Sequence, residues 1–147
     1  MPRTRDINLG KQRQELIEYF NKKNEILTIY IFGSHGTTYE NEMSDIDLGI
    51  SFDNEMSLMQ VLTIAGEIEM IISKEVDLLD FNKVNILLKY KIIKTGEIIF
   101  ERDEIKTANL KEKVLKEYFD FGFKLKKMKE DFRESLRKEY VYDGWYG

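Results

Sequence analysis

The chain has 147 residues and a mass of 17.5 kDa, the size of one ordinary domain, and its 42% hydrophobic and 12% aromatic residues are enough to build a core. It contains no cysteine, which excludes disulfides, zinc thiolate sites and cysteine nucleophiles. The 23 basic and 27 acidic residues give a net charge of −4, which argues against a protein that coats duplex DNA. No stretch has the character of a signal peptide or a membrane span, so we expect a cytoplasmic protein that has no contact with the membrane.

The first half of the chain predicts a helix, two strands and a second helix. Asn8 is suited to cap a helix over about residues 9–23, and the β-branched and aromatic run ILTIYIF predicts a buried strand over 26–32. The segment 45–52, DIDLGISF, alternates polar and apolar residues, which indicates a strand with one polar face. Ser57 is suited to cap a helix that ends near Ser73.

The second half predicts two further strands, each followed by a helix. We expect a strand at 75–81, a helix at 84–94 closed by Thr95-Gly96, and a short strand at 97–101. Apolar residues at steps of three and four predict one long helix over about 107–139, long enough for part of it to project. This order predicts an α/β (α+β) fold with helices packed on a sheet. We expect a single domain, in which a C-terminal helical extension and aromatic tail (106–147) follow residues 1–105.

The acidic charge of the chain is concentrated in residues 31–60. This stretch holds six carboxylates and no Lys or Arg, a local charge of −6, while the remainder nets +2. A solvated acidic surface and a site for divalent cations are both consistent with this charge.

A GSx10DxD pattern lies within this acidic stretch. Gly33 and Ser34 end the first predicted strand, and Asp45 and Asp47 open the second. A glycine at a strand end lets the backbone approach a ligand, and the following N–H groups and hydroxyl can bind phosphate oxygens. Aspartates at i and i+2 of a strand share one face, roughly 6 to 7 Å apart, so both can reach one magnesium cluster.

Asp77, in the third predicted strand, is the candidate for a third carboxylate. If that strand lies beside the second, Asp77 completes a site for two-metal phosphoryl or nucleotidyl transfer. Asp80 is a rival candidate, and a salt-bridged surface role for Asp77 is the alternative.

The segments FGSHGTTYENEMSDIDLGI, VDLLDF and KTGEIIFERD resemble the minimal nucleotidyltransferases of the polymerase-β superfamily, over about residues 10–105. Within that superfamily the chain most resembles the MNT antitoxins encoded beside HEPN ribonuclease toxins. The resemblance implies a small mixed sheet flanked by helices, and Mg²⁺-dependent transfer of AMP from ATP to a tyrosine hydroxyl of the partner toxin, in a heteromeric complex. It also implies that Gly33 and Ser34 bind the nucleotide phosphates, that Asp45 and Asp47 ligate metal, and that Asp77 ligates metal and acts as the base.

The loop after Gly33-Ser34 departs from the Arg-rich loop that is usual in this family. It reads His35-Gly36-Thr37-Thr38-Tyr39, so phosphate charge would depend more on metal. A local hydrogen bond and a contact with a phosphate or with the acceptor are alternative roles for His35, and Tyr39 is a candidate for stacking on the base.

Aromatic residues on the last helix and in the tail predict a protein partner. We therefore weigh a second function, an antitoxin that neutralises its toxin by binding alone, and a third, nucleotidyl transfer to a small molecule or an RNA end. Direct nucleic-acid binding is disfavoured by the net charge, and the four lysines between 124 and 129 are interpreted first as a solvated helix face.

Overall fold

The computed structural model describes residues 11–33 and 46–142, with side chains up to residue 139. The helices and strands of this part follow the order predicted from the sequence, with these bounds: α1 (Lys11–Lys22), β1 (Ile26–Phe32), β2 (Ile46–Phe52), α2 (Leu58–Ile72), β3 (Val76–Asp80), α3 (Ile86–Thr95), β4 (Glu97–Glu101) and α4 (Glu104–Tyr142).

The four strands form one mixed sheet in the order β3-β2-β1-β4. β1 is antiparallel to both β2 and β4, whereas β2 and β3 are parallel. A parallel pair needs a crossover between its strands, and α2 supplies it. The predicted mixed sheet flanked by helices is therefore confirmed.

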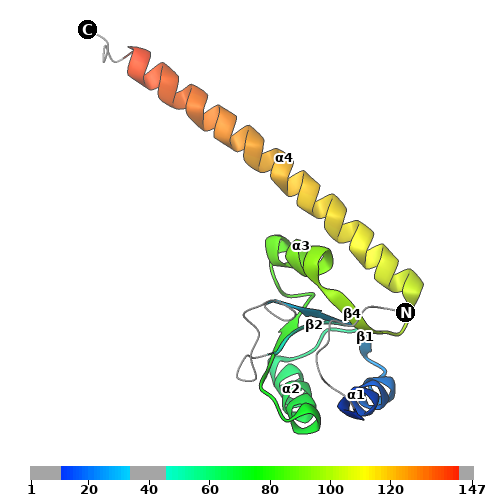
Figure 1. The fold of residues 1–147 in the computed structure, drawn as a ribbon. Coiled ribbons are helices and arrows are strands. Elements are labelled where there is room, and N and C mark those ends of the chain that lie inside the picture. The colour runs from blue at the N-terminus through cyan, green and yellow to red at the C-terminus, as the bar shows by residue number, and fades with distance from the viewer. Residues whose placement is uncertain (1–10, 34–45, 143–147) are drawn as a thin grey trace.

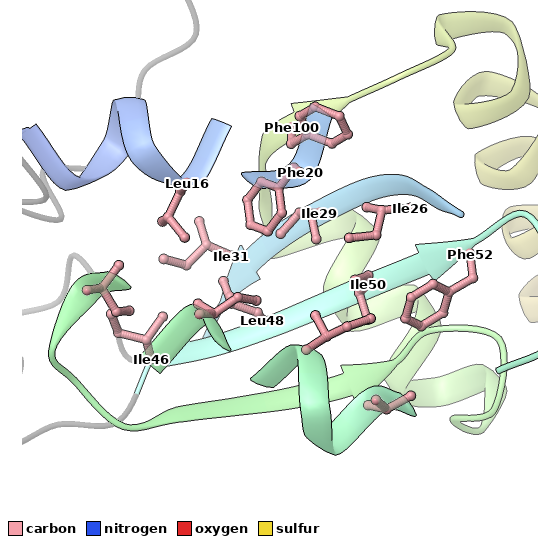
Figure 2. Packing of buried hydrophobic residues seen from close by; sticks show 14 of the residues in the cluster. Leu16, Phe20, Ile26, Ile29, Ile31, Ile46, Leu48, Ile50, Phe52 and Phe100 are labelled. Carbon is pink, nitrogen blue, oxygen red and sulfur yellow. The ribbon is translucent and has the colours of Figure 1, made fainter. Parts of the chain in front are cut away.

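Helices cover both faces of the sheet (Figure 1). α1 and α2 lie on one face, where their apolar sides pack against the larger buried cluster. Figure 2 shows Leu16 and Phe20 of α1 facing Ile29 and Ile31 of β1. α3 and the first part of α4 lie on the other face, over a smaller cluster that contains Tyr30, Phe32, Phe81, Ile92 and Val114.

Local capping explains where the helices begin and end. Ser57 caps α2 as predicted: its hydroxyl accepts from the Gln60 backbone N–H, and the Gln60 side chain accepts from the Ser57 N–H. Asn85 caps α3 by accepting from the Leu88 N–H. The predicted Asn8 cap lies outside the described residues.

The last helix begins three residues earlier than expected. Asp103 Oδ1 accepts from the backbone N–H groups of Ile105 and Lys106 at 3.0 and 3.1 Å, so this residue caps the helix and α4 starts at Glu104 rather than near Thr107. Its 39 residues span about 58 Å at 1.5 Å per residue.

Only the first part of α4 packs on the domain. Thr107 and Val114 are buried, the Thr107 hydroxyl is 2.8 Å from the Thr28 hydroxyl, and the Tyr118 ring stacks on Tyr90 with centroids 3.6 Å apart. Figure 1 shows the later part of α4 standing clear of the domain, and Phe119, Phe123 and Phe132 on this part are exposed. The apolar side of α4 therefore packs on the domain only in the first part of the helix, and the expected projection is confirmed. Within residues 11–33 and 46–142, no helix combines the length and apolar character needed to cross a membrane.

Candidate functional site

The candidate site lies at the end of the sheet where β1 finishes and β2 and β3 begin. Phe32 of β1 pairs with Asp47 of β2, and Asp47 in turn pairs with Asp77 of β3. Gly33 follows Phe32 directly, so three of the predicted site residues meet at one edge of the sheet. Ser34 and Asp45, like His35 and Tyr39, lie outside the described residues.

Asp47 and Asp77 occupy equivalent positions on two parallel strands, so the condition for a shared site, that β3 lies beside β2, is met. Neighbouring strands are roughly 4.8 Å apart. Leu79, two positions after Asp77, packs against the smaller cluster, and a Cβ at Gly49, two positions after Asp47, would meet Ile92 of α3 at 3.4 Å. Because residues two apart share a face, both carboxylates lie on the face that α3 covers.

Gly33 allows the chain to turn tightly against Asp47. Its φ is +88°, in the left-handed region that side chains disfavour. A Cβ at this position would overlap Asp47 Oδ2 and would lie 3.0 Å from Asp47 Cγ. Two independent reasons therefore favour glycine at this position: the left-handed backbone conformation, and the Asp47 carboxylate, which occupies the space that a Cβ would need.

The two carboxylates fit the ligand preference of Mg²⁺. Asp47 is half-buried and Asp77 is exposed, so the pair is open to solvent on one side. Carboxylate oxygens are hard ligands, and a divalent cation relieves the repulsion between two neighbouring negative charges. Among the described residues no group of three or more His, Cys, Asp or Glu side chains has the geometry of a metal site. The predicted third ligand, Asp45, is outside that set, so the three-aspartate site stays a prediction.

Asp80, the rival of Asp77, has a structural role at the other end of β3. Its Oδ1 accepts from the Asn82 N–H at 3.0 Å, and its Oδ2 is 3.9 Å from Lys83 Nζ. The Asp80 side chain is only 9% exposed and lies three residues from Asp77, roughly 10 Å along the strand. Asp80 thus closes the turn after β3, which leaves Asp77 as the candidate near Asp47.

The acidic stretch is split between the two ends of β2. Asp53 follows the last residue of β2, roughly 20 Å along the strand from Asp47, and forms an ion pair of 3.2 Å with Lys106 of α4. The polar face predicted for this strand is also largely covered, since Ser51 is 1% exposed. Part of the −6 charge therefore supports the docking of α4.

A cavity of about 450 Å³ lies between β1, α3, β4 and α4, and sequence reasoning did not anticipate it. It is lined by Tyr30, Ile93, Gly96, Glu97, Ile98, Thr107 and Lys111. Glu97 pairs with Ile31, so this cavity approaches the edge of the sheet that carries Gly33. Burial, with a smaller contribution from Glu101, raises the pKa of Tyr30 to about 12, so its phenol is neutral at physiological pH. Only the strand register brings these residues together, and no sequence pattern marks them.

Comparison with known proteins defines the family. The model of the polymerase beta nucleotidyltransferase family matches residues 14–105, which is more than half of the chain. The chain belongs to this family and is a nucleotidyltransferase.

A protein of Methanocaldococcus jannaschii named "Putative protein adenylyltransferase" is 31% identical over 87 residues, which is 59% of this chain and 92% of that protein. This similarity supports the assignment of the chain as a nucleotidyltransferase.

Solved structures with the same fold come from toxin–antitoxin complexes. A chain of the MntA-HepT complex has a TM-score of 0.65 at 15% identity, covering 84% of this chain and 97% of its own. A toxin–antitoxin structure with AMP-PNP has a TM-score of 0.68 at 17% identity, with coverages of 82% and 98%. A chain from the tri-AMPylated Shewanella oneidensis HEPN toxin in complex with MNT antitoxin scores 0.65 at 16% identity, with coverages of 84% and 97%. At these identities the likeness establishes the fold alone.

Proposed function

We propose that this chain is a Mg²⁺-dependent adenylyltransferase that transfers AMP from ATP to a tyrosine hydroxyl of a HEPN-family ribonuclease toxin, and so acts as its antitoxin. The observation that carries the proposal is the register of Asp47 with Asp77, next to the left-handed Gly33. The named adenylyltransferase relative and the AMPylated toxin complex with the same fold support the choice of reaction and partner.

Each site residue has a part in this reaction. The phosphate oxygens of ATP bind the backbone N–H groups after Gly33 and the hydroxyl of Ser34. Asp45, Asp47 and Asp77 would hold magnesium, which when bound neutralises phosphate charge and lowers the pKa of the acceptor hydroxyl. The acceptor oxygen attacks the α-phosphorus, its proton passes to Asp77, and the bond from the α-phosphorus to pyrophosphate breaks. The products are an O-AMP ester and pyrophosphate.

A second candidate function is neutralisation of the toxin by contact alone. It is favoured by Phe119 and Phe123, which are 64% and 73% exposed on the projecting half of α4. Exposed phenylalanines of this kind are typical of a surface that a protein partner covers.

The experiment that separates these functions uses ATP labelled in its α-phosphate, Mg²⁺ and the HEPN-type protein encoded by a neighbouring gene. We expect label on that protein with the native chain and none with Asp47→Asn or Asp77→Asn. Asp53→Asn is the matched control, because it makes the same change at the far end of β2 and should leave transfer intact. Neutralisation that survives Asp47→Asn without label on the toxin would support the contact-only function instead.

A further inference from the structure

The projecting half of α4 carries an apolar face that nothing in the described chain covers. Phe121, Leu125, Met128 and Phe132 are 38%, 40%, 67% and 64% exposed. They continue the line along which Thr107, Val114 and Tyr118 pack on the domain, but Figure 1 shows the helix standing clear of the domain here. Taking roughly 200 Å² for each of the four side chains, about 400 Å² of their surface is exposed on each helix.

The spacing of this face matches a two-helix coiled coil. Tyr118, Phe121, Leu125, Met128 and Phe132 follow one another at steps of three, four, three and four. In heptad terms Tyr118, Leu125 and Phe132 occupy a positions, and Phe121 and Met128 occupy d positions. The g positions, which flank such a seam, hold Glu117, Lys124, Asp131 and Lys138.

We propose that this face pairs with the same face of a second copy of the chain, with the two α4 helices antiparallel. In the register centred between Lys126 and Lys127, Phe121 meets Phe132 of the second copy and Leu125 meets Met128. The pair has twofold symmetry, so each contact between two different residues occurs twice, once from each copy of the chain.

The charges at the edge of the seam select this orientation. In an antiparallel pair, g positions face g positions, so Lys124 faces Asp131 of the second copy. Symmetry makes two opposite-charge pairs and leaves no like-charge pair along that edge.

A parallel pair would have the opposite electrostatics. Its g positions face e positions five residues further along the second helix, which brings Lys124 against Lys129. Glu117 would face Gly122 and Asp131 would face Leu136, so neither acid would meet a base. Parallel pairing therefore gains no ion pair and brings two pairs of lysines together.

The exposed area approaches the area of a specific dimer. Four side chains from each helix cover about 800 Å² in total, and the flanking stems raise this towards the roughly 1,000 Å² expected of a biological interface. The seam ends at Tyr118, because the part of α4 that precedes this residue packs the same face on the domain. At the boundary the Tyr118 ring stacks on Tyr90 of α3. The two enzyme domains then lie at opposite ends of the helix pair.

The test measures the mass of the full-length chain by sedimentation, at concentrations up to about 100 μM. We expect a dimer. Leu125→Glu should convert it to a monomer, whereas Phe123→Glu, two residues away on the opposite side of the helix, should leave it dimeric. Both residues lie beyond the part of α4 that packs on the domain, so the circular dichroism spectrum should stay native in both variants.

Charge reversal tests the orientation. Lys124→Glu should weaken the dimer about tenfold, because a glutamate at position 124 of each copy would face Asp131 of the other copy and make two like-charge pairs. The double variant Lys124→Glu with Asp131→Lys should restore the dimer. A parallel dimer would respond in the opposite way, because Lys124→Glu would replace a repulsion with an attraction to Lys129.

Three results would overturn the proposal: a monomer at every concentration, a dimer that Leu125→Glu does not affect, or a dimer that Lys124→Glu strengthens. A monomer whose capture of the HEPN-type protein is lost in Leu125→Glu would assign the face to that partner instead. Because sedimentation does not depend on AMP transfer, this outcome is separate from that of the proposed function.

Discussion

Replacement of Gly33 by alanine perturbs the candidate site with a single methyl group. The residue has a φ of +88°, and the added Cβ would overlap Asp47 Oδ2. The variant must therefore change its backbone at the end of β1, or move the Asp47 carboxylate, or both.

The expected cost comes from two sources. Holding alanine in a left-handed conformation costs about 1 to 2 kcal/mol. Relieving an overlap against a strand residue costs about 1 to 2 kcal/mol more. We expect the free energy of unfolding to fall by about 2 to 4 kcal/mol, which corresponds to a melting temperature lower by roughly 5 to 15 °C. AMP transfer should fall about 100-fold, since a carboxylate displaced by about 1 Å no longer positions its ligand.

Gly49→Ala is the matched control for this variant. Gly49 lies two residues from Asp47 on the same strand, and its added Cβ would meet Ile92 at 3.4 Å, an ordinary van der Waals contact. We expect a stability change below about 1 kcal/mol and native transfer activity. Thermal melts and labelled AMP transfer at saturating and limiting ATP measure both effects. If Gly33→Ala is as stable and as active as Gly49→Ala, the close approach of Gly33 to Asp47 has no functional importance and the reasoning is wrong.

Two further predictions concern stability away from the site. Arg102 donates to the carbonyls of Phe20, Lys23 and Ile26 at 2.7, 3.0 and 2.8 Å, and so joins the end of α1 to the sheet. Arg102→Lys should lower the free energy of unfolding, measured by urea titration, by about 2 kcal/mol, because the single ammonium of lysine cannot make the several bonds of the guanidinium. An unchanged midpoint would show that the three contacts together contribute nothing to stability. Gly66→Ala in α2 should raise the same quantity by about 0.5 to 1 kcal/mol, since a Cβ there meets nothing within 4 Å; a lower midpoint would contradict this.

Periodicity predicted the elements well because the apolar pattern of each one is strong. The run ILTIYIF of β1 is buried on both faces, as its composition indicates, and Ser57 begins α2 through the capping box that its spacing to Gln60 permits. From the sequence, Asp47 and Asp77 could be predicted to lie close together only on the condition that β2 pairs with β3. This pairing alone brings together two residues that are 30 positions apart.

The features that the sequence did not predict have a common physical origin. A hydrophobic pattern shows which side of an element is apolar, but not which other element covers it. Ser51 lies on a strand face that looks polar in the sequence, yet this face is covered and Ser51 is 1% exposed. Phe121 to Phe132 form a stripe that looks like core, yet the domain ends before reaching it. Asp103 was not predicted as a cap because Ile105, the one apolar residue in the first turn of α4, lies off the apolar side that marks the rest of the helix and is exposed.

The parallel pairing of β2 with β3 has a consequence for the folding of the enzyme. Asp47 and Asp77 become neighbours only after the intervening crossover helix has formed and the two strands have paired, a contact between segments distant in the chain. During synthesis, the carboxylate pair is absent until β3 has left the ribosome. A cation or nucleotide that bridges these strands binds the folded chain alone, so it should stabilise the fold by an amount that grows with the logarithm of its concentration relative to its Kd.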